Sequence, residues 1–173
     1  RHVKSRSSRS IVSLIACSGF VSLLACGSET SMSTDAGPLD PNRPRIEVGG
    51  GLSAFEPFGE DTRMVLGLQG GWHIDVSSRF FNIDAVGLPL TIEGFDVATG
   101  QRVTFTLERL HPDRHEVDTG DGIRTRTGDR LILDISSPEQ LHERKLRIVA
   151  TGQSQDGTTA TGEANVVVLR PRL

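Results

Sequence analysis

The sequence predicts an all-β domain, an antiparallel β-sandwich of about seven or eight strands with one short helical turn. Apolar and polar residues alternate in short runs over most of residues 46–173, which is the pattern of half-buried strands. Turns rich in glycine separate these runs, and the one helical signal is a short segment near the C-terminal end. These three observations predict the fold class.

The first segment is basic, with Arg1, Lys4, Arg6 and Arg9 and no acid among them. An apolar run over residues 11–25 follows and leads to Cys26. This succession is typical of a secretory signal, and the run is shorter than the ~20 residues that a membrane-spanning helix needs. We therefore predict a signal peptide over residues 1–25.

The residues Leu23-Leu24-Ala25-Cys26-Gly27 resemble the lipobox of bacterial lipoproteins. The resemblance implies cleavage before Cys26, acylation of its thiol, and sorting to the outer membrane because Gly27 follows. Leu24 departs from the usual lipobox, which has a smaller residue two positions before the cysteine. Cys17 is a rival site, but the apolar run that precedes it is too short for a signal core. The expected lipid attachment site is Cys26, and the expected location is the cell envelope.

Residues 26–45 consist mainly of small, polar and proline residues and show no apolar period. Such a segment cannot bury enough apolar surface to order itself, so we predict a flexible linker between the lipid and the domain. No cysteine follows Cys26 in the chain, so the predicted domain over residues 46–173 contains no disulfide.

Seven alternating or continuous apolar runs are expected to form strands: residues 64–68, 72–80, 90–97, 103–107, 131–135, 146–150 and 166–169. In the second run Trp72 is expected to point inward together with Ile74 and Val76. The third run changes phase at Gly94, which predicts a β-bulge there. The residues expected on the buried face of the first and fourth runs are Met64, Leu66, Leu68, Val103, Phe105 and Leu107.

Three turn signals separate these runs: Gly70-Gly71, Ala98-Thr99-Gly100 and Gln155-Asp156-Gly157. The segment Ser137-Pro138-Glu139-Gln140-Leu141 combines a capping serine with a proline suited to a first helical turn, so it predicts a single turn crossing between sheets. A helical turn followed by a long terminal hairpin resembles the last three strands of immunoglobulin-like domains. Residues 46–73 are also similar to uncharacterised lipoproteins of myxobacteria, a similarity that implies no activity.

A possible ligand or metal site lies in the loop between His111 and Asp121. His111 and His115 are four residues apart, and Asp118 and Asp121 flank a glycine as in a calcium loop. Pro112 prevents a helix, and the closing glutamate of a calcium loop is missing, so an exposed loop without metal is the preferred interpretation. His73 and His142 are expected at the surface.

No catalytic motif is found in the sequence. Gly49-Gly50-Gly51 lacks the lysine and the helix of a phosphate-binding loop, and no serine stands in a nucleophile elbow. Glu60 and Asp61 are adjacent, so on a strand they would face opposite ways. Aromatic residues make up only 5% of the chain, which argues against a carbohydrate-binding or base-stacking surface.

The expected function is therefore that of a lipid-anchored envelope protein with a non-catalytic interaction or structural module. The partners would be the membrane, through the lipid on Cys26, and a protein of the envelope. No cofactor is expected, and the acidic charge outside the first segment disfavours nucleic acid. Two alternatives remain: a small-ligand or metal-binding lipoprotein that uses the His111–Asp121 loop, and an enzyme without a sequence signature.

The lipid anchor can be tested by metabolic labelling with a tagged fatty acid. The wild-type chain should be labelled and the Cys26→Ser variant should not, because the thiol of Cys26 is the expected acceptor of the acyl chain. Equal labelling of the two proteins would contradict the assignment.

Overall fold

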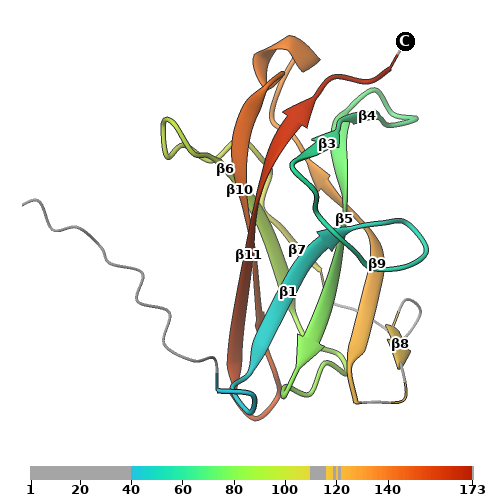
Figure 1. Ribbon diagram of the computed structural model, residues 1–173, viewed down its shortest axis with the longest axis vertical. Helices are drawn as coiled ribbons and strands as arrows, with labels where there is room; N and C mark the ends of the chain where they lie inside the picture. Colours follow the sequence, from blue (N-terminus) through green and yellow to red (C-terminus); the bar gives the residue numbers. More distant parts are fainter. Residues whose placement is uncertain (1–39, 110–115, 119, 121, 173) are drawn as a thin grey trace, which may run out of the picture. The chain divides into compact units, whose positions relative to one another are not determined.

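The computed structural model describes residues 40–109, 116–118, 120 and 122–172, and these residues are mostly β-strand. The predicted signal peptide, Cys26 and most of the predicted linker lie outside the described residues. The strands are β1 (Arg45–Gly50), β2 (Glu56–Pro57), β3 (Asp61–Arg63), β4 (Val65–Leu66), β5 (Trp72–Phe81), β6 (Leu90–Asp96), β7 (Leu107–Arg109), β8 (Glu116–Asp118), β9 (Arg124–Ile132), β10 (Arg144–Gln153) and β11 (Thr159–Leu169). The all-β prediction is confirmed (Figure 1).

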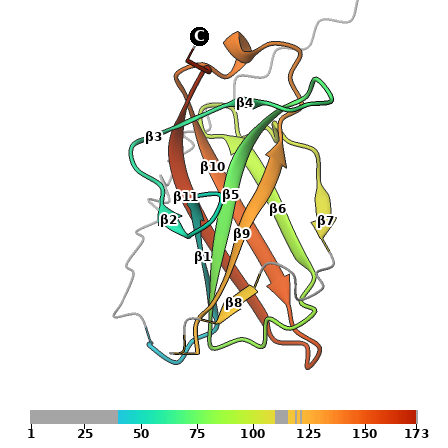
Figure 2. The same ribbon diagram turned by 90° about the vertical axis from the view of Figure 1, so that its right-hand side faces the viewer.

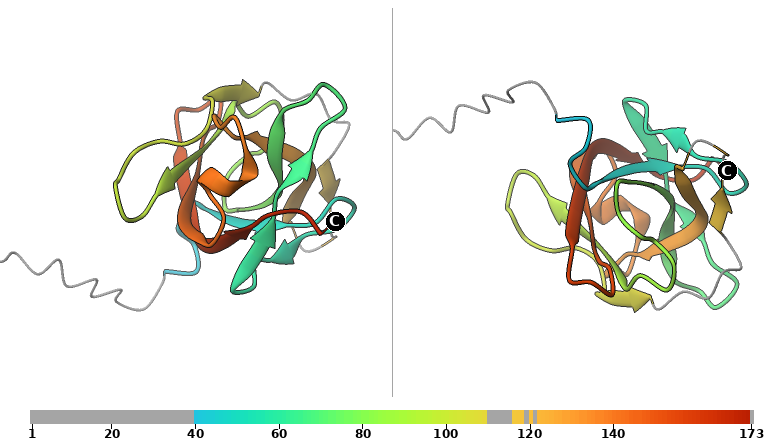
Figure 3. Two further views of the ribbon diagram at one scale, coloured as in Figure 1. Left: turned by 90° about the horizontal axis from the view of Figure 1, so that it is seen from above. Right: turned by 90° about the horizontal axis from the view of Figure 1, so that it is seen from below.

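The strands form two sheets. In sheet A the order is β2-β1-β5-β9-β8, and β4 pairs with one end of β5. In sheet B the order is β3-β11-β10-β6-β7. Figure 2 looks onto sheet A, and Figure 3 shows end-on how the strands of both sheets surround a shared interior. All the pairings between these strands are antiparallel except that of β3 with β11, which is parallel.

The core lies between the sheets and is built from the alternating residues of their long strands. Ile74 and Val76 of β5 are fully buried, as are Leu146 and Ile148 of β10. Trp72 is half-buried and packs against this core. The predicted parity of the 72–80 and 146–150 runs is therefore confirmed, and each fully buried aliphatic side chain contributes about 1.5–3 kcal/mol to folding.

The predicted bulge at Gly94 is wrong. β6 alternates regularly through its last residue and pairs with β10 without a register shift. Phe95 lies on the outer face, where the guanidinium of Arg147 is 5.4 Å from the ring centroid. The sequence suggests a phase change because the two inward positions after Ile92 are not apolar: they are Gly94 and Asp96. The buried carboxylate of Asp96 pairs with Arg144 at 2.6 Å.

The predicted strand over residues 103–107 is also wrong. Thr104 is buried and Phe105 is half exposed, the reverse of the expected parity. Residues 102–105 instead cross from one sheet to the other, because Arg102 bridges to Phe95 of sheet B and Thr104 bridges to Leu133, next to β9 of sheet A.

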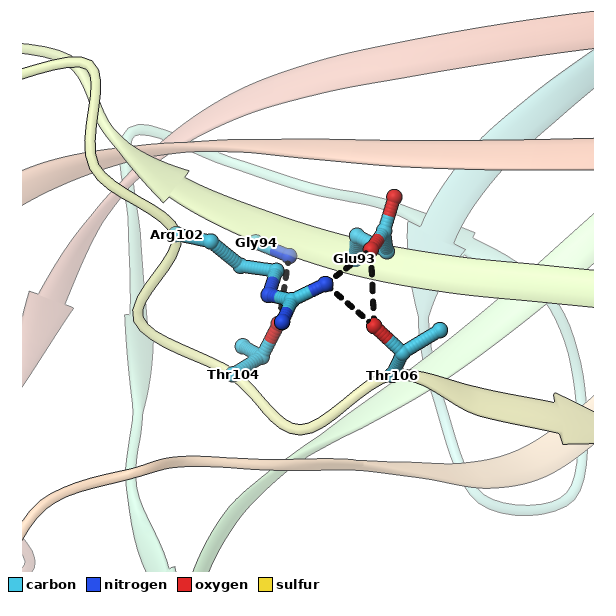
Figure 4. Close-up of polar contacts among 5 residues, drawn as sticks. All are labelled: Glu93, Gly94, Arg102, Thr104 and Thr106. Atoms are coloured by element: carbon cyan, nitrogen blue, oxygen red, sulfur yellow. Dashed lines mark hydrogen bonds and ion pairs between the residues drawn. The ribbon is translucent and has the colours of Figure 1, made fainter.

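Polar contacts fix this crossing to β6 (Figure 4). The Thr104 hydroxyl accepts a hydrogen bond of 2.9 Å from the backbone N–H of Gly94. A β-carbon at Gly94 would come within 2.8 Å of the Thr104 methyl group, so only glycine allows the approach. On the solvent side Arg102 and Thr106 both contact the carboxylate of Glu93, at 2.9 Å each.

The predicted strand over residues 64–68 is replaced by a second crossing from sheet B to sheet A. β3 pairs with β11 in sheet B and β4 pairs with β5 in sheet A, so the chain changes sheets at Met64. Met64 is buried, and its N–H donates to the carbonyl of Leu169 at 2.9 Å. Leu66 and Leu68, both expected inside, are exposed because the chain reverses at Gly67.

The predicted helical turn and terminal hairpin are confirmed. A short 3₁₀ helix, η1 (Pro138–Gln140), links β9 of sheet A to β10 of sheet B. The side-chain oxygen of Gln140 accepts hydrogen bonds from the N–H groups of Ser136 and Ser137 at its start. β10 and β11 pair over their whole shared length, and the turn between them contains Gly157 with φ +88°.

A buried ion pair in β9 was not expected from the sequence. Arg126 and Asp129 have side chains only 3% exposed and are joined by two hydrogen bonds, one of 2.6 Å. They flank a bulge opposite Ser77, where Gly128 has φ +73°. Val76 is the register partner of Asp129, so this ion pair borders the apolar core.

The two sheets approach most closely where β11 passes β1. A β-carbon added at Gly162 of β11 would lie 1.8 Å from the carbonyl oxygen of Ile46. Because that neighbour is backbone, no side-chain rotation can relieve the contact. A glycine at position 162 is therefore required by the spacing of the sheets and not by a turn.

We predict that Gly162→Ala lowers the free energy of unfolding by about 1–3 kcal/mol or more, as overpacking of a close contact does. Gly59→Ala is the matched control, since a β-carbon there meets nothing within 4 Å. Chemical denaturation of both variants measures the difference. A Gly162→Ala protein as stable as the Gly59→Ala protein would show that β1 and β11 are not in close contact.

Candidate interaction surface

The ligand site considered from the sequence falls largely outside the residues that the structure describes. His111, His115 and Asp121 lie outside the described residues, and Asp118 is the last residue of β8. Among the residues that the structure describes, no group of three or more histidine, cysteine or acidic side chains could hold a metal ion. No helix in the described part of the chain is long and apolar enough to cross a membrane.

His73 was expected at the surface, but it is only 4% exposed. Trp72 faces the core, so the next residue of the strand, His73, lies on the outer face of sheet A. The β4–β5 hairpin covers it there. Gly67 of this hairpin donates its N–H to the carbonyl of Gly71 at 2.8 Å. A β-carbon at Gly67 would lie 3.5 Å from the Nδ1 of His73, so the hairpin passes directly over the imidazole ring.

The environment of His73 favours its neutral form. Burial lowers the pKa of His73 below its ordinary value of 6.5; the carboxylate of Asp75 opposes this shift and the charge of Arg130 adds to it. The His73 Nε2 and the Asp75 Oδ1 are 3.5 Å apart, which is long for a hydrogen bond. The buried Asp75 Oδ1 has no hydrogen-bond partner among the described atoms.

A hollow of about 470 Å³ opens beside His73. Its lining residues are Gly67, Leu68, Gln69, Gly71, His73, Arg130 and Ile132. The absence of side chains at Gly67 and Gly71 helps to create this space, because both glycines belong to the hairpin above the imidazole. Of these described lining residues none is a serine, threonine, cysteine or lysine that could act as a nucleophile beside His73.

Exposed apolar side chains lie in and beside this hollow. Leu68 lines it, and the register places Val65 of β4 beside His73 of β5, and His73 beside Ile132 of β9. The same row continues to Phe105, whose N–H donates to the carbonyl of Ile132 at 3.1 Å. The exposed fractions are 40% for Val65, 106% for Leu68 and 50% for Phe105. We call these three residues and the hollow the apolar surface.

The apolar surface is not predicted by the alternation in the sequence. That pattern predicts Leu66, Leu68 and Phe105 in the core, because leucine and phenylalanine at alternating positions usually face inward. A usable signal was present: Leu66 and Leu68 flank Gly67 and precede Gly70-Gly71, so a hairpin tip was the alternative to a strand. For Phe105 there was no such signal, because its exposure follows from the burial of Thr104 against Gly94.

The chain was compared with protein-family models, with curated proteins and with solved structures, and it matches none of them.

The buried histidine predicts a pH dependence of stability. Because the pKa of His73 is lower in the folded chain, the unfolded chain binds a proton there first as the pH falls below about 6.5. Stability should therefore decrease between pH 7.5 and 5.5, and His73→Gln should make the melting temperature less sensitive to pH over this range. The control is His142→Gln, which keeps His73. Identical pH profiles for wild type and His73→Gln would contradict the prediction.

Proposed function

We propose that this chain is a lipid-anchored protein of the cell envelope, and that its β-domain is a non-catalytic module that binds a partner protein. The anchor would be the lipid on Cys26, which would hold the domain at the outer membrane. The lipobox-like residues 23–27 and the apolar run before them support the anchor. The apolar surface supports the binding role.

We further propose that the domain is immunoglobulin-like. The order β1-β5-β9-β8 in sheet A corresponds to the ABED sheet of such domains, and β6-β10-β11 in sheet B corresponds to the CFG sheet. The seven strands β1, β5, β6, β8, β9, β10 and β11 take the letters A to G in chain order. The 3₁₀ helix η1 then lies between β9, which is strand E, and β10, which is strand F. β2, β3, β4 and β7 are additional short strands beyond this set.

The observation that carries the binding role is the exposure of Leu68 in the lining of a hollow, with Val65 and Phe105 exposed beside it. Single exposed apolar residues are common on soluble proteins, but a cluster that borders a concave site is typical of an interface. Leu68 has no shielding from the rest of the domain, so it would lose its contact with water only on binding. The polar groups of His73 and Arg130, which also line the hollow, could orient a partner's side chain.

The same residues argue against hydrolysis through a covalent intermediate at this site. A histidine and a carboxylate side by side can serve as general base and orienting group, but that mechanism also needs a side-chain nucleophile within hydrogen-bond reach. The lining residues on the described chain supply none. The distance of 3.5 Å between His73 and Asp75 also falls short of a well-formed dyad. Binding is therefore the function that this geometry supports best.

The proposal predicts a cross-link at Leu68. A photoreactive phenylalanine analogue at position 68 of the full chain, activated in living cells, should give one discrete adduct with an envelope protein. Val65→Thr introduced into the same chain should reduce the adduct, because it removes an apolar contact beside His73. It should change the free energy of unfolding by less than about 0.5 kcal/mol, since the Val65 side chain is 40% exposed and threonine has nearly the same shape.

The matched control carries the same analogue at Thr151, an exposed residue on the opposite sheet. No discrete adduct is expected there. Adducts of equal yield at both positions would indicate random encounters, and the absence of any adduct at position 68 would refute the binding role. Either result would leave the lipid anchor to be judged by the labelling of Cys26.

A further inference from the structure

A second hollow, of about 610 Å³, is lined largely by cationic side chains. Arg63, His142, Arg170 and Arg172 line it, together with Glu143. It lies at the end of the sandwich where β11 finishes, opposite the end where β1 begins (Figure 1). We call this site the arginine hollow. It shares none of its lining residues with the apolar surface.

The arginine hollow is assembled from three segments that backbone pairing holds together. Arg63 ends β3, where it is the register partner of Leu169 in β11. The Arg63 Nη1 donates to the carbonyl of Arg170 at 3.1 Å, which fixes this guanidinium against the chain that carries the other two arginines. The third segment follows η1, and the N–H of Glu143 donates to the carbonyl of Val168 at 2.7 Å.

The arginines of this hollow form no close ion pair with a described carboxylate. Within the described residues no ion pair of 4.0 Å or less involves Arg63, Arg170 or Arg172, whereas Arg102, Arg126, Arg144 and Arg147 each have one. Three guanidinium groups and the one carboxylate of Glu143 line the hollow, so its lining carries an excess of two positive charges. Arginine clusters left unpaired around a concave site favour the binding of an anion.

His142 also lines the hollow. Its Nδ1 is buried and has no hydrogen-bond partner among the described atoms, and proteins rarely leave a buried polar atom without one. The hollow therefore includes a side chain whose hydrogen-bonding capacity is not used within the described chain.

We propose that the arginine hollow binds a phosphate group. A phosphomonoester carries about −1.5 to −2 charges at neutral pH, which matches the excess positive charge, whereas a single carboxylate carries only one. Planar guanidinium groups bind phosphate oxygens in bidentate fashion, and several of them can share its three free oxygens. The phosphate can belong to a small phosphoester or to a lipid headgroup, and the two sources are separated by experiment.

The test is a titration of the purified full-length protein in detergent, with inorganic phosphate as the probe. At constant ionic strength, phosphate at a hundredfold excess over its Kd should raise the melting temperature by several degrees, and acetate should not. Arg172→Gln should weaken phosphate binding at least tenfold without loss of folding, because no described contact holds the Arg172 side chain. Arg63→Gln should have the same effect on binding. Arg147→Gln, an exposed arginine of sheet B, is the control and should bind as wild type does.

A second arm uses the Cys26→Ser chain and vesicles of phosphatidylcholine with or without phosphatidic acid. Binding to vesicles with phosphatidic acid that is lost in Arg172→Gln assigns the phosphate to a lipid headgroup, even if free phosphate binds weakly. Binding of free phosphate alone assigns it to a soluble phosphoester. Equal effects of phosphate and acetate, or unchanged binding by both Arg63→Gln and Arg172→Gln in both arms, would overturn the proposal. Neither result depends on the apolar surface.

Discussion

The close approach of β11 to β1 determines how the two sheets can share one core. At Gly162 the separation between the strands leaves no room for a β-carbon against the carbonyl of Ile46. This contact brings sheet A and sheet B together along one edge, so the side chains of Ile46 and Val166 are shielded from water. A larger residue at position 162 would separate the edges and expose the apolar side chains that stabilise both sheets.

The opposite edge is closed by different chemistry. There the chain between β6 and β7 passes from one sheet to the other, and the Thr104 hydroxyl bonds to the backbone of Gly94. The ion pair of Arg126 and Asp129 borders the core in the neighbouring strand β9. A buried ion pair contributes little net stability, but removing one partner is costly because the other charge is left unpaired. This edge therefore relies on specific polar partners, whereas the edge at Gly162 relies on steric fit.

The change of sheets at Met64 also creates both proposed sites. Before Met64, β3 pairs with β11 and places Arg63 at the arginine hollow. After Met64, β4 pairs with β5, places Val65 beside His73 and leads to Leu68 in the lining of the hollow. Burial of Met64, with its N–H bonded to Leu169, fixes the point at which one segment becomes the other. The two surfaces are thus positioned by one buried residue, although their chemistry differs.

The sequence by itself determined the fold class, the parity of the long strands, the turns and the short helix, because each depends on residues close together in the chain. Ile74 and Val76 alternate with polar residues, and Gly157 follows Asp156 at a hairpin, whatever lies elsewhere.

Only the tertiary structure decided which apolar residues remain outside. Phe105 is exposed because Thr104 bonds to Gly94, and His73 is buried because a hairpin passes over it. The same holds for the arginine hollow, whose residues lie up to 109 positions apart in the chain and meet only because β3 pairs with β11. Local periodicity carries no information about such long-range contacts, so it could reveal neither the arginine hollow nor the exposure of Phe105.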